Sequence, residues 1–202
     1  MSAGFNQPLP SSSEFYYEPL ARLFTRIGLK EENPTRYFDS LDLNIAFQKI
    51  RDDRRTRAYQ SDIEVREQNT SELLGITLGA EKDFGIGFQV HWGVDAYLDW
   101  VSSARQKKNL QTDMSSSAPS RFPNGSRMNT YGAFSDISFA LLPSLTLDGG
   151  LRYSYIDTEI AATAASPQGR SQLNDLTGSI GLLFEPWVNT EFIASFRRGF
   201  RA

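Results

Sequence analysis

Apolar and polar residues alternate strictly over residues 86–103, IGFQVHWGVDAYLDWVSS. Every even-numbered position from Ile86 to Trp100 is apolar, and the positions between them are mostly polar or small. Successive side chains of a β-strand point to opposite faces, so the run predicts one apolar and one polar face. It is much longer than the usual strand of about 5–6 residues. A tilted strand needs about 9–11 residues to cross a bilayer. We therefore predict a transmembrane β-strand with its even-numbered side chains on lipid.

The same period of two recurs along most of the chain, and almost no stretch has a helical period. We expect about eight strands. Besides the run above, the alternating stretches are 21–29, 41–48, 74–80, 131–141, 145–155, 176–184 and 188–197. No apolar run approaches the roughly 18 residues of a transmembrane helix. The pattern predicts an all-β fold, an antiparallel transmembrane β-barrel segment.

The connections between these strands fall into two alternating kinds. The short ones are 82–85, 142–144 and 185–187, with a somewhat longer one at 30–39, and each contains Gly, Pro or Asp. Such residues are typical of tight turns. The long ones are 51–68, 105–127 and 158–172. Outer-membrane barrels have short periplasmic turns and long extracellular loops. A soluble protein with two sheets is the alternative, but it has little use for strands this long.

The bulk composition agrees with this interpretation. The chain has 202 residues, no cysteine and a formal net charge of −3. The acidic balance gives no support to nucleic-acid binding. The lack of cysteine excludes disulfides and thiolate metal sites. A mean hydropathy of −0.40 suits a barrel, because every other residue faces a polar interior. We expect residues 1–202 to be part of a single β-barrel domain, with 1–14 as a loop.

Four polar residues on the first run are candidates for a ligand path. By alternation Gln89, His91, Asp95 and Asp99 point into the barrel. His91 is the only histidine, and one histidine does not make a metal site. It is either a hydrogen-bonded residue of the lumen or part of a route for a ligand. No nucleophile, base or paired-carboxylate arrangement is recognisable, so we expect no enzyme, no metal and no cofactor.

The charged run 51–57, RDDRRTR, lies at a junction between strand and loop. It fits a strand that continues into solvent. It also fits a surface that contacts the phosphates of lipopolysaccharide, because arginine binds phosphate through paired hydrogen bonds. The residues themselves leave both interpretations open.

Four stretches of the chain resemble one known family. They are VDAYLDWVSS (94–103), SRFPNGSRMNTYGAF (120–134), GGLRYSY (149–155) and FIASFRRGFRA (192–202). Together they are similar to the barrel of TonB-dependent outer-membrane receptors, most of all to the haem- and haemoglobin-receptor-like branch. In that branch the last strand runs into a Phe-Arg-Ala-Pro motif, of which Phe200, Arg201 and Ala202 are the beginning.

The resemblance implies a 22-stranded barrel in the outer membrane of a Gram-negative bacterium. Its expected partners are the TonB complex through a plug segment, outer-membrane lipid and lipopolysaccharide, and an extracellular iron-bearing ligand. That ligand would be haem, a haem protein or a ferric siderophore. Neither the plug nor the TonB-contacting segment is in this chain, and the family's haem-ligating histidine would lie beyond Ala202. The alternative function is a passive porin or a small structural barrel.

From the two ends of the chain we expect a fragment of a longer protein. The N-terminus, MSAGFNQPLPSSSEF, lacks the basic start and apolar stretch of a signal peptide. The C-terminus stops within a basic, aromatic run that carries no turn signal.

Overall fold

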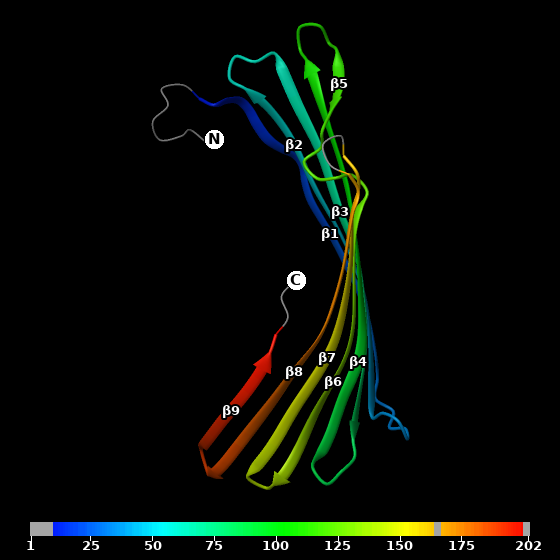
Figure 1. The fold of residues 1–202 in the computed structure, drawn as a ribbon, viewed down its shortest axis with the longest axis vertical. Coiled ribbons are helices and arrows are strands. Elements are labelled where there is room, and N and C mark those ends of the chain that lie inside the picture. The colour runs from blue at the N-terminus through cyan, green and yellow to red at the C-terminus, as the bar shows by residue number, and fades with distance from the viewer. Residues whose placement is uncertain (1–9, 164–166, 200–202) are drawn as a thin grey trace.

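The computed structural model describes residues 10–163 and 167–199, and these form one antiparallel sheet (Figure 1). The strands follow one another as a meander, except that the short β5 pairs only with β4. Among the described residues we find no helix with the length and hydropathy to cross a membrane. The strands are β1 (Ser12–Glu31), β2 (Ser40–Ala58), β3 (Ile63–Asp83), β4 (Phe88–Asn109), β5 (Ser115–Ala118), β6 (Ser126–Leu142), β7 (Leu145–Ile160), β8 (Gly169–Trp187) and β9 (Thr190–Arg198).

The alternation along β4 sorts the whole sheet into two faces, because side chains of directly paired residues share a face. Val94 pairs with Leu78 on β3 and Ala133 on β6, which continues an apolar row. The neighbouring Asp95 pairs with Thr77 and Gly132. The apolar and polar rows therefore extend across the strands, as the period of two predicted.

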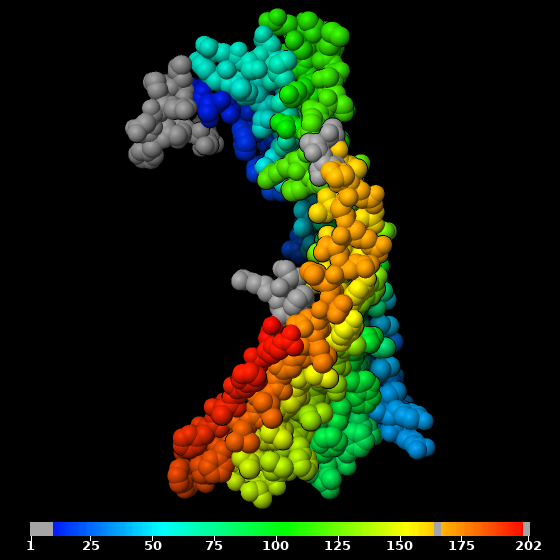
Figure 2. Space-filling model, in the orientation of Figure 1, coloured from blue at the N-terminus to red at the C-terminus, as the bar shows by residue number. Residues whose placement is uncertain are grey.

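The described residues form a single curved layer, hollowed on one side (Figure 2). Its polar face lines the concave side, where a hollow is bordered by charged side chains. The apolar face carries large exposed side chains, such as Leu151 with 55% of its surface accessible. Ala80 is the one buried apolar residue in the described part of the chain. An apolar surface this extensive needs lipid or another apolar partner.

The apolar band has the height of a bilayer. On β4 the outward aromatic residues Phe88 and Trp100 bracket it. At roughly 3.4 Å per residue and a tilt of about 40°, this stretch rises about 30 Å. The hydrocarbon core of a membrane is about 30 Å thick. Aromatic residues at both edges are typical of transmembrane barrels.

The short turns lie together at one end of the sheet, as predicted, but one of them is displaced. Residues 84–87 and 143–144 join their strands near the predicted positions. The turn predicted at 185–187 lies instead at 188–189, because Trp187 still pairs with Thr190. Asn189 has a φ of 65°. Asparagine tolerates this left-handed conformation better than most residues, so it permits the tight turn.

The predicted long loops are wrong in large part, because the strands continue through them. Within 51–68, β2 runs to Ala58 and β3 begins at Ile63. Within 105–127 and 158–172, β4, β7 and β8 likewise extend into the predicted loops, and the short β5 also lies there. The first strand begins at Ser12, inside the segment 1–14 that was predicted as a loop. Beyond the lipid both faces of a strand are in water, so an apolar face is no longer needed and the alternation disappears.

Ion pairs hold the β2–β3 extension where apolar packing has ended. Glu64 is 1% exposed, and its two carboxylate oxygens each lie 2.6 Å from the Nε of Arg55 or Arg66. Arg57 lies 2.9 Å from Glu14 on β1. Burial alone raises the pKa of Glu64, but the hydrogen bonds and charges of Arg66 and Arg55 outweigh it and hold this pKa below its usual value.

The sheet is open within the described residues. β1 pairs with β2 alone, and β9 with β8 alone. Unpaired backbone groups are costly in lipid, so the two edges require further strands.

The first prediction concerns the lipid-facing row. Val94 lies midway between Phe88 and Trp100, and Val94→Arg should destabilise the full-length barrel by about 2–4 kcal/mol, because it places a charge near the bilayer centre. Ser138→Arg, on the polar face beside Gln89 and Asp148, should cost much less. Urea unfolding in lipid vesicles measures both. Equal losses would show that the faces are assigned wrongly.

The second prediction concerns pH. Because the pKa of Glu64 is lowered in the folded state, its ion pairs contribute their full stability above the unfolded pKa of about 4.3. That contribution is lost as the pH falls through the folded pKa. Hydrogen exchange of residues 55–66 in the full-length protein, corrected for intrinsic rates, should show local opening below about pH 4. In Glu64→Gln the protection should be lower at neutral pH and change less on acidification; an unchanged profile would contradict the assignment.

Candidate functional site

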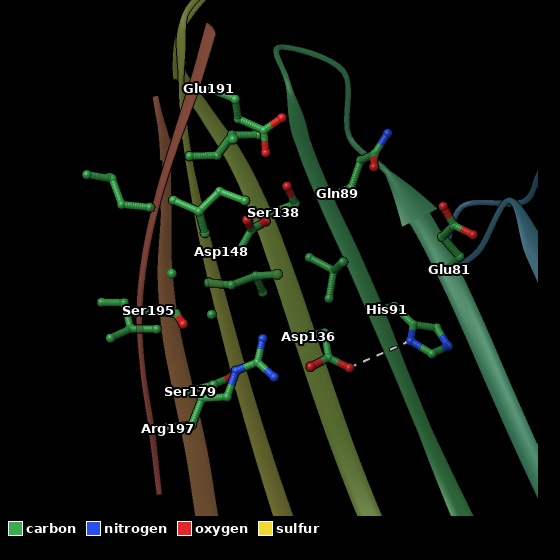
Figure 3. Close-up of a pocket in the computed structure, with 18 residues that line it drawn as sticks. Glu81, Gln89, His91, Asp136, Ser138, Asp148, Ser179, Glu191, Ser195 and Arg197 are labelled. Atoms are coloured by element: carbon green, nitrogen blue, oxygen red, sulfur yellow. Dashed lines mark ion pairs between the residues drawn. The ribbon is translucent and has the colours of Figure 1, made fainter. Parts of the chain in front are cut away.

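A hollow on the concave face of the sheet is the candidate site (Figure 3). It has a volume of about 400 Å³. Alternation brings one or two polar side chains from each strand to it, and they lie close because the strands are paired in register. The charged side chains around it are Glu81 on β3, His91 on β4, Asp136 on β6, Asp148 on β7, and Glu191 and Arg197 on β9.

His91 lies at one side of this hollow and is half exposed. Its Nδ1 is 3.8 Å from Oδ2 of Asp136, and its ring centroid is 5.1 Å from that of Phe134. The separation from Asp136 is too long for a direct hydrogen bond. Within the described part of the chain no direct hydrogen bond to either imidazole nitrogen is found, so the ring is open to a group that enters the hollow.

Carboxylates dominate the electrostatics of the hollow. Glu81, Asp136, Asp148 and Glu191 face a single arginine, Arg197, and the histidine. Such a surface favours a partner that carries positive charge or hydrogen-bond donors.

A partly buried ion pair lies next to the hollow, on the side away from the short turns. Asp95 is 8% exposed, and Arg152 reaches it from β7 with two contacts of 2.8 and 2.9 Å. The guanidinium crosses the intervening strand above Gly132. A Cβ at that position would lie 2.2 Å from Nη2 of Arg152, so glycine is what lets the pair form. This bidentate geometry is the strong form of an arginine–carboxylate contact.

The four residues predicted for a ligand path share the concave face but do not converge. Gln89 donates a 3.3 Å hydrogen bond to Asp83 near the short turns. Asp99 accepts a 3.1 Å hydrogen bond from Ser71. Asp95 forms an ion pair with Arg152. Of the four residues, Gln89 and His91 line the hollow, and Asp95 and Asp99 lie outside it. Their part in ligand passage stays a prediction. Phe200, Arg201 and Ala202 lie outside the described residues.

Sequence reasoning missed several residues of the site. Asp136, Glu191 and Arg197 line the same hollow as His91 only through the register of five strands, which no local pattern reveals. The signal available in the sequence was that each of them belongs to the polar set of alternating positions on its strand.

The arginines of the charged run 51–57 are all paired with carboxylates. Arg51 contacts Asp53 and Arg54 contacts Asp52, each at 2.9 Å. Arg55 and Arg57 contact Glu64 and Glu14. These pairs favour the strand extension over a free phosphate site, because the guanidiniums are already neutralised.

The third prediction concerns the Asp95–Arg152 pair. Arg152→Leu leaves a buried carboxylate without its partner and should destabilise the full-length barrel by about 1–3 kcal/mol. Replacing both residues, with Asp95→Leu added, should recover much of the loss, because no uncompensated charge remains. Denaturant midpoints of the two variants and the wild type provide the measurement. A double variant as unstable as the single one would mean that the pair acts only through packing.

Comparison with known proteins places this geometry in a family. Residues 3–202 match the family model described as TonB dependent receptor-like, beta-barrel. A search of curated protein sequences found no match.

Three solved structures illustrate the likeness of the fold. The "Copper transporter OprC" superposes with a TM-score of 0.76 at 15% identity, covering 91% of this chain and 30% of that one. The ferric citrate transporter FecA, in its unliganded form, gives 0.61 at 12% identity, with coverages of 86% and 26%. The siderophore receptor PiuA from Acinetobacter baumannii gives 0.56 at 11%, with 87% and 32%.

This chain thus spans about a third or less of the length of each of these structures. At such low identity they show the fold alone, and they agree with an all-β wall of a larger barrel. The match to the family model covers nearly the whole chain, and the chain therefore belongs to the TonB-dependent receptor-like β-barrel family.

Proposed function

We propose that the full-length protein is an outer-membrane receptor of a Gram-negative bacterium that imports an iron-bearing ligand with energy delivered through TonB. The observation that carries this is the family match over residues 3–202. Members of this family are transporters rather than enzymes, in agreement with what the sequence led us to expect. The curved sheet, with one apolar and one polar face, supports a place in the wall of such a barrel.

The ligand we propose is haem, a haem protein or a ferric siderophore. Haem is suggested by the resemblance of four stretches of this sequence to the haem-receptor-like branch. A ferric chelate is suggested by the names of two solved neighbours, a ferric citrate transporter and a siderophore receptor. The experiment below includes both classes.

The two faces suggest different partners. The convex apolar face would contact outer-membrane lipid, and the extension above it would lie among lipopolysaccharide. The acidic hollow on the concave face suits a basic surface of a plug domain, through which the TonB complex would act. His91, at the side of that hollow, would then lie between the plug and the wall, and Gln89, Asp95 and Asp99 would line the path above and below it.

The rival function is a passive porin, or a small structural barrel, with no energy coupling. A passive barrel would have the same kind of sheet with the same two faces, so the sheet alone does not distinguish a porin from a TonB-dependent receptor. They differ in the dependence of transport on TonB and the proton gradient.

The fourth prediction tests this difference. A strain that lacks its own iron receptors and expresses the full-length protein should take up radiolabelled iron from haem or from ferric citrate. Deletion of tonB, or a protonophore, should abolish that uptake while leaving the amount of receptor in the outer membrane unchanged. A TonB-box deletion in the receptor is the matched control. Uptake that persists without TonB would establish the passive pore instead.

A further inference from the structure

A segment between β5 and β6 departs from the wall of the sheet. Arg105 on β4 pairs with Ala118 of β5, and Val101 pairs with Ser126 of β6. Three residues of β4, 102–104, therefore lie opposite seven residues of the connection, 119–125. The surplus chain cannot remain in the ladder, and in Figure 1 the light-green loop that follows β5 stands off the sheet on its concave side. We call residues 119–125 the lumen segment.

Contacts of Phe122 confirm the face on which the lumen segment lies. Its backbone N–H donates to Oγ of Ser103, at 3.4 Å. Its side chain borders a small hollow with Ile50, Val101 and Ser71. By the period of two, Ser103, Val101 and Ser71 share the face of Asp95 and His91. The side chain of Phe122 thus lies on the face that a complete barrel encloses, whereas Asn124 borders a hollow with Arg51 and Thr70 on the other face.

Buried hydrogen bonds hold the lumen segment in place. Ser103 and Asn69 are each 5% exposed, and Oγ of Ser103 donates to Oδ1 of Asn69 at 2.6 Å. The backbone N–H of Asn69 donates to Asp53, which is 4% exposed. Asn124 accepts a 3.0 Å hydrogen bond from the backbone of Ser103. This chain of buried groups from β2 to the segment fixes its position, because breaking it would leave polar groups unsatisfied.

The tip presents a positive charge and an aromatic ring. Arg121 and Phe122 are both exposed, and the guanidinium carbon lies 5.3 Å from the centre of the Phe122 ring. Among the described residues no carboxylate forms an ion pair with Arg121. Other arginines of this face are neutralised: Arg54 by Asp52 and Arg105 by Glu67.

Two arginines of β1 add to this charge on the same face. Arg22 and Arg26 donate to the amide oxygens of Gln48 and Asn44, at 2.9 and 3.0 Å, instead of to carboxylates. Arg22 pairs with Ile50, which also borders the hollow beside Phe122. The carboxylates nearby are Asp52, which is neutralised by Arg54, and Asp99, which accepts from Ser71.

We propose that Arg121 and Phe122 form a contact point inside the receptor for an iron complex that carries carboxylates, with Arg22 as a second positive group on the wall. A guanidinium held against an aromatic ring is pre-organised to bind a carboxylate through two hydrogen bonds. The proposal deepens the proposed function, on which it rests, by naming the ligand class and the residues. Ferric citrate and haem, through its propionates, both supply this chemistry.

The fifth prediction is tested by binding to the purified full-length receptor, which needs neither TonB nor energy. The probes are ferric citrate, haem and a neutral ferric trihydroxamate. The wild type should bind at least one of the two carboxylate-bearing probes, and which of the two identifies the source. Arg121→Gln should raise the Kd of that probe about tenfold, the effect of losing a charged hydrogen bond. Arg121→Lys should recover part of the affinity.

Arg36→Gln is the matched control. Arg36 is also exposed and lies over its neighbouring ring, Tyr37, at 5.9 Å, but in the turn between β1 and β2 at the opposite end of the sheet. It should leave the Kd unchanged. An unchanged Kd in Arg121→Gln, an equal loss in Arg36→Gln, or a wild type that binds neither carboxylate-bearing probe would overturn the proposal. Binding that behaves as expected, with uptake that does not need TonB, would overturn the proposed function alone.

Discussion

The structure depends on one constraint, that every backbone N–H and C=O in lipid must be hydrogen-bonded to a neighbouring strand. A long paired ladder satisfies it, and the period of two then separates an apolar face from a polar one. The row through Val94 lies on one face and the row through Asp95 on the other, across β3, β4 and β6. A wall of this kind needs no apolar core, which is why its large apolar side chains are exposed. The open edges at β1 and β9 follow from the same constraint, since only further strands can pair them.

On the concave face, charge is balanced both across strands and along them, as in the Asp52–Arg54 pair of β2. Arg152 passes above Gly132 to reach Asp95, and the site below it collects carboxylates from β3, β6, β7 and β9. Farther from the short turns the balance is reversed, where among the described residues no carboxylate forms an ion pair with Arg121 or Arg22. A wall that is acidic where a plug would pack and positive where a ligand would enter suits the transport function that we propose. The same arrangement would be of no evident use to a purely structural barrel.

Beyond the lipid the physical basis of the strands changes. Glu64, buried beneath Arg55 and Arg66, takes the role that apolar rows have lower down. For the lumen segment, the backbone N–H of Phe122 donates to Oγ of Ser103, which in turn donates to Oδ1 of Asn69. The Arg55–Glu64 and Ser103–Asn69 contacts join strands that already pair in register, so the part of the sheet beyond the lipid continues the transmembrane ladder. The charged run 51–57 is therefore a piece of sheet whose arginines are already paired, and its contact with lipopolysaccharide remains a proposal.

The sequence by itself determined the all-β fold, the two faces and the positions of most short turns. These features follow from the period of two, which each strand carries locally because lipid on one side demands it. Only the tertiary structure decided how far the strands extend, since residues 51–58 and 63–68 face water on both sides and show no alternation. It also decided which polar residues meet. Asp95 and Arg152 lie 57 positions apart, and the register of three strands, which many backbone hydrogen bonds set together, brings them into contact.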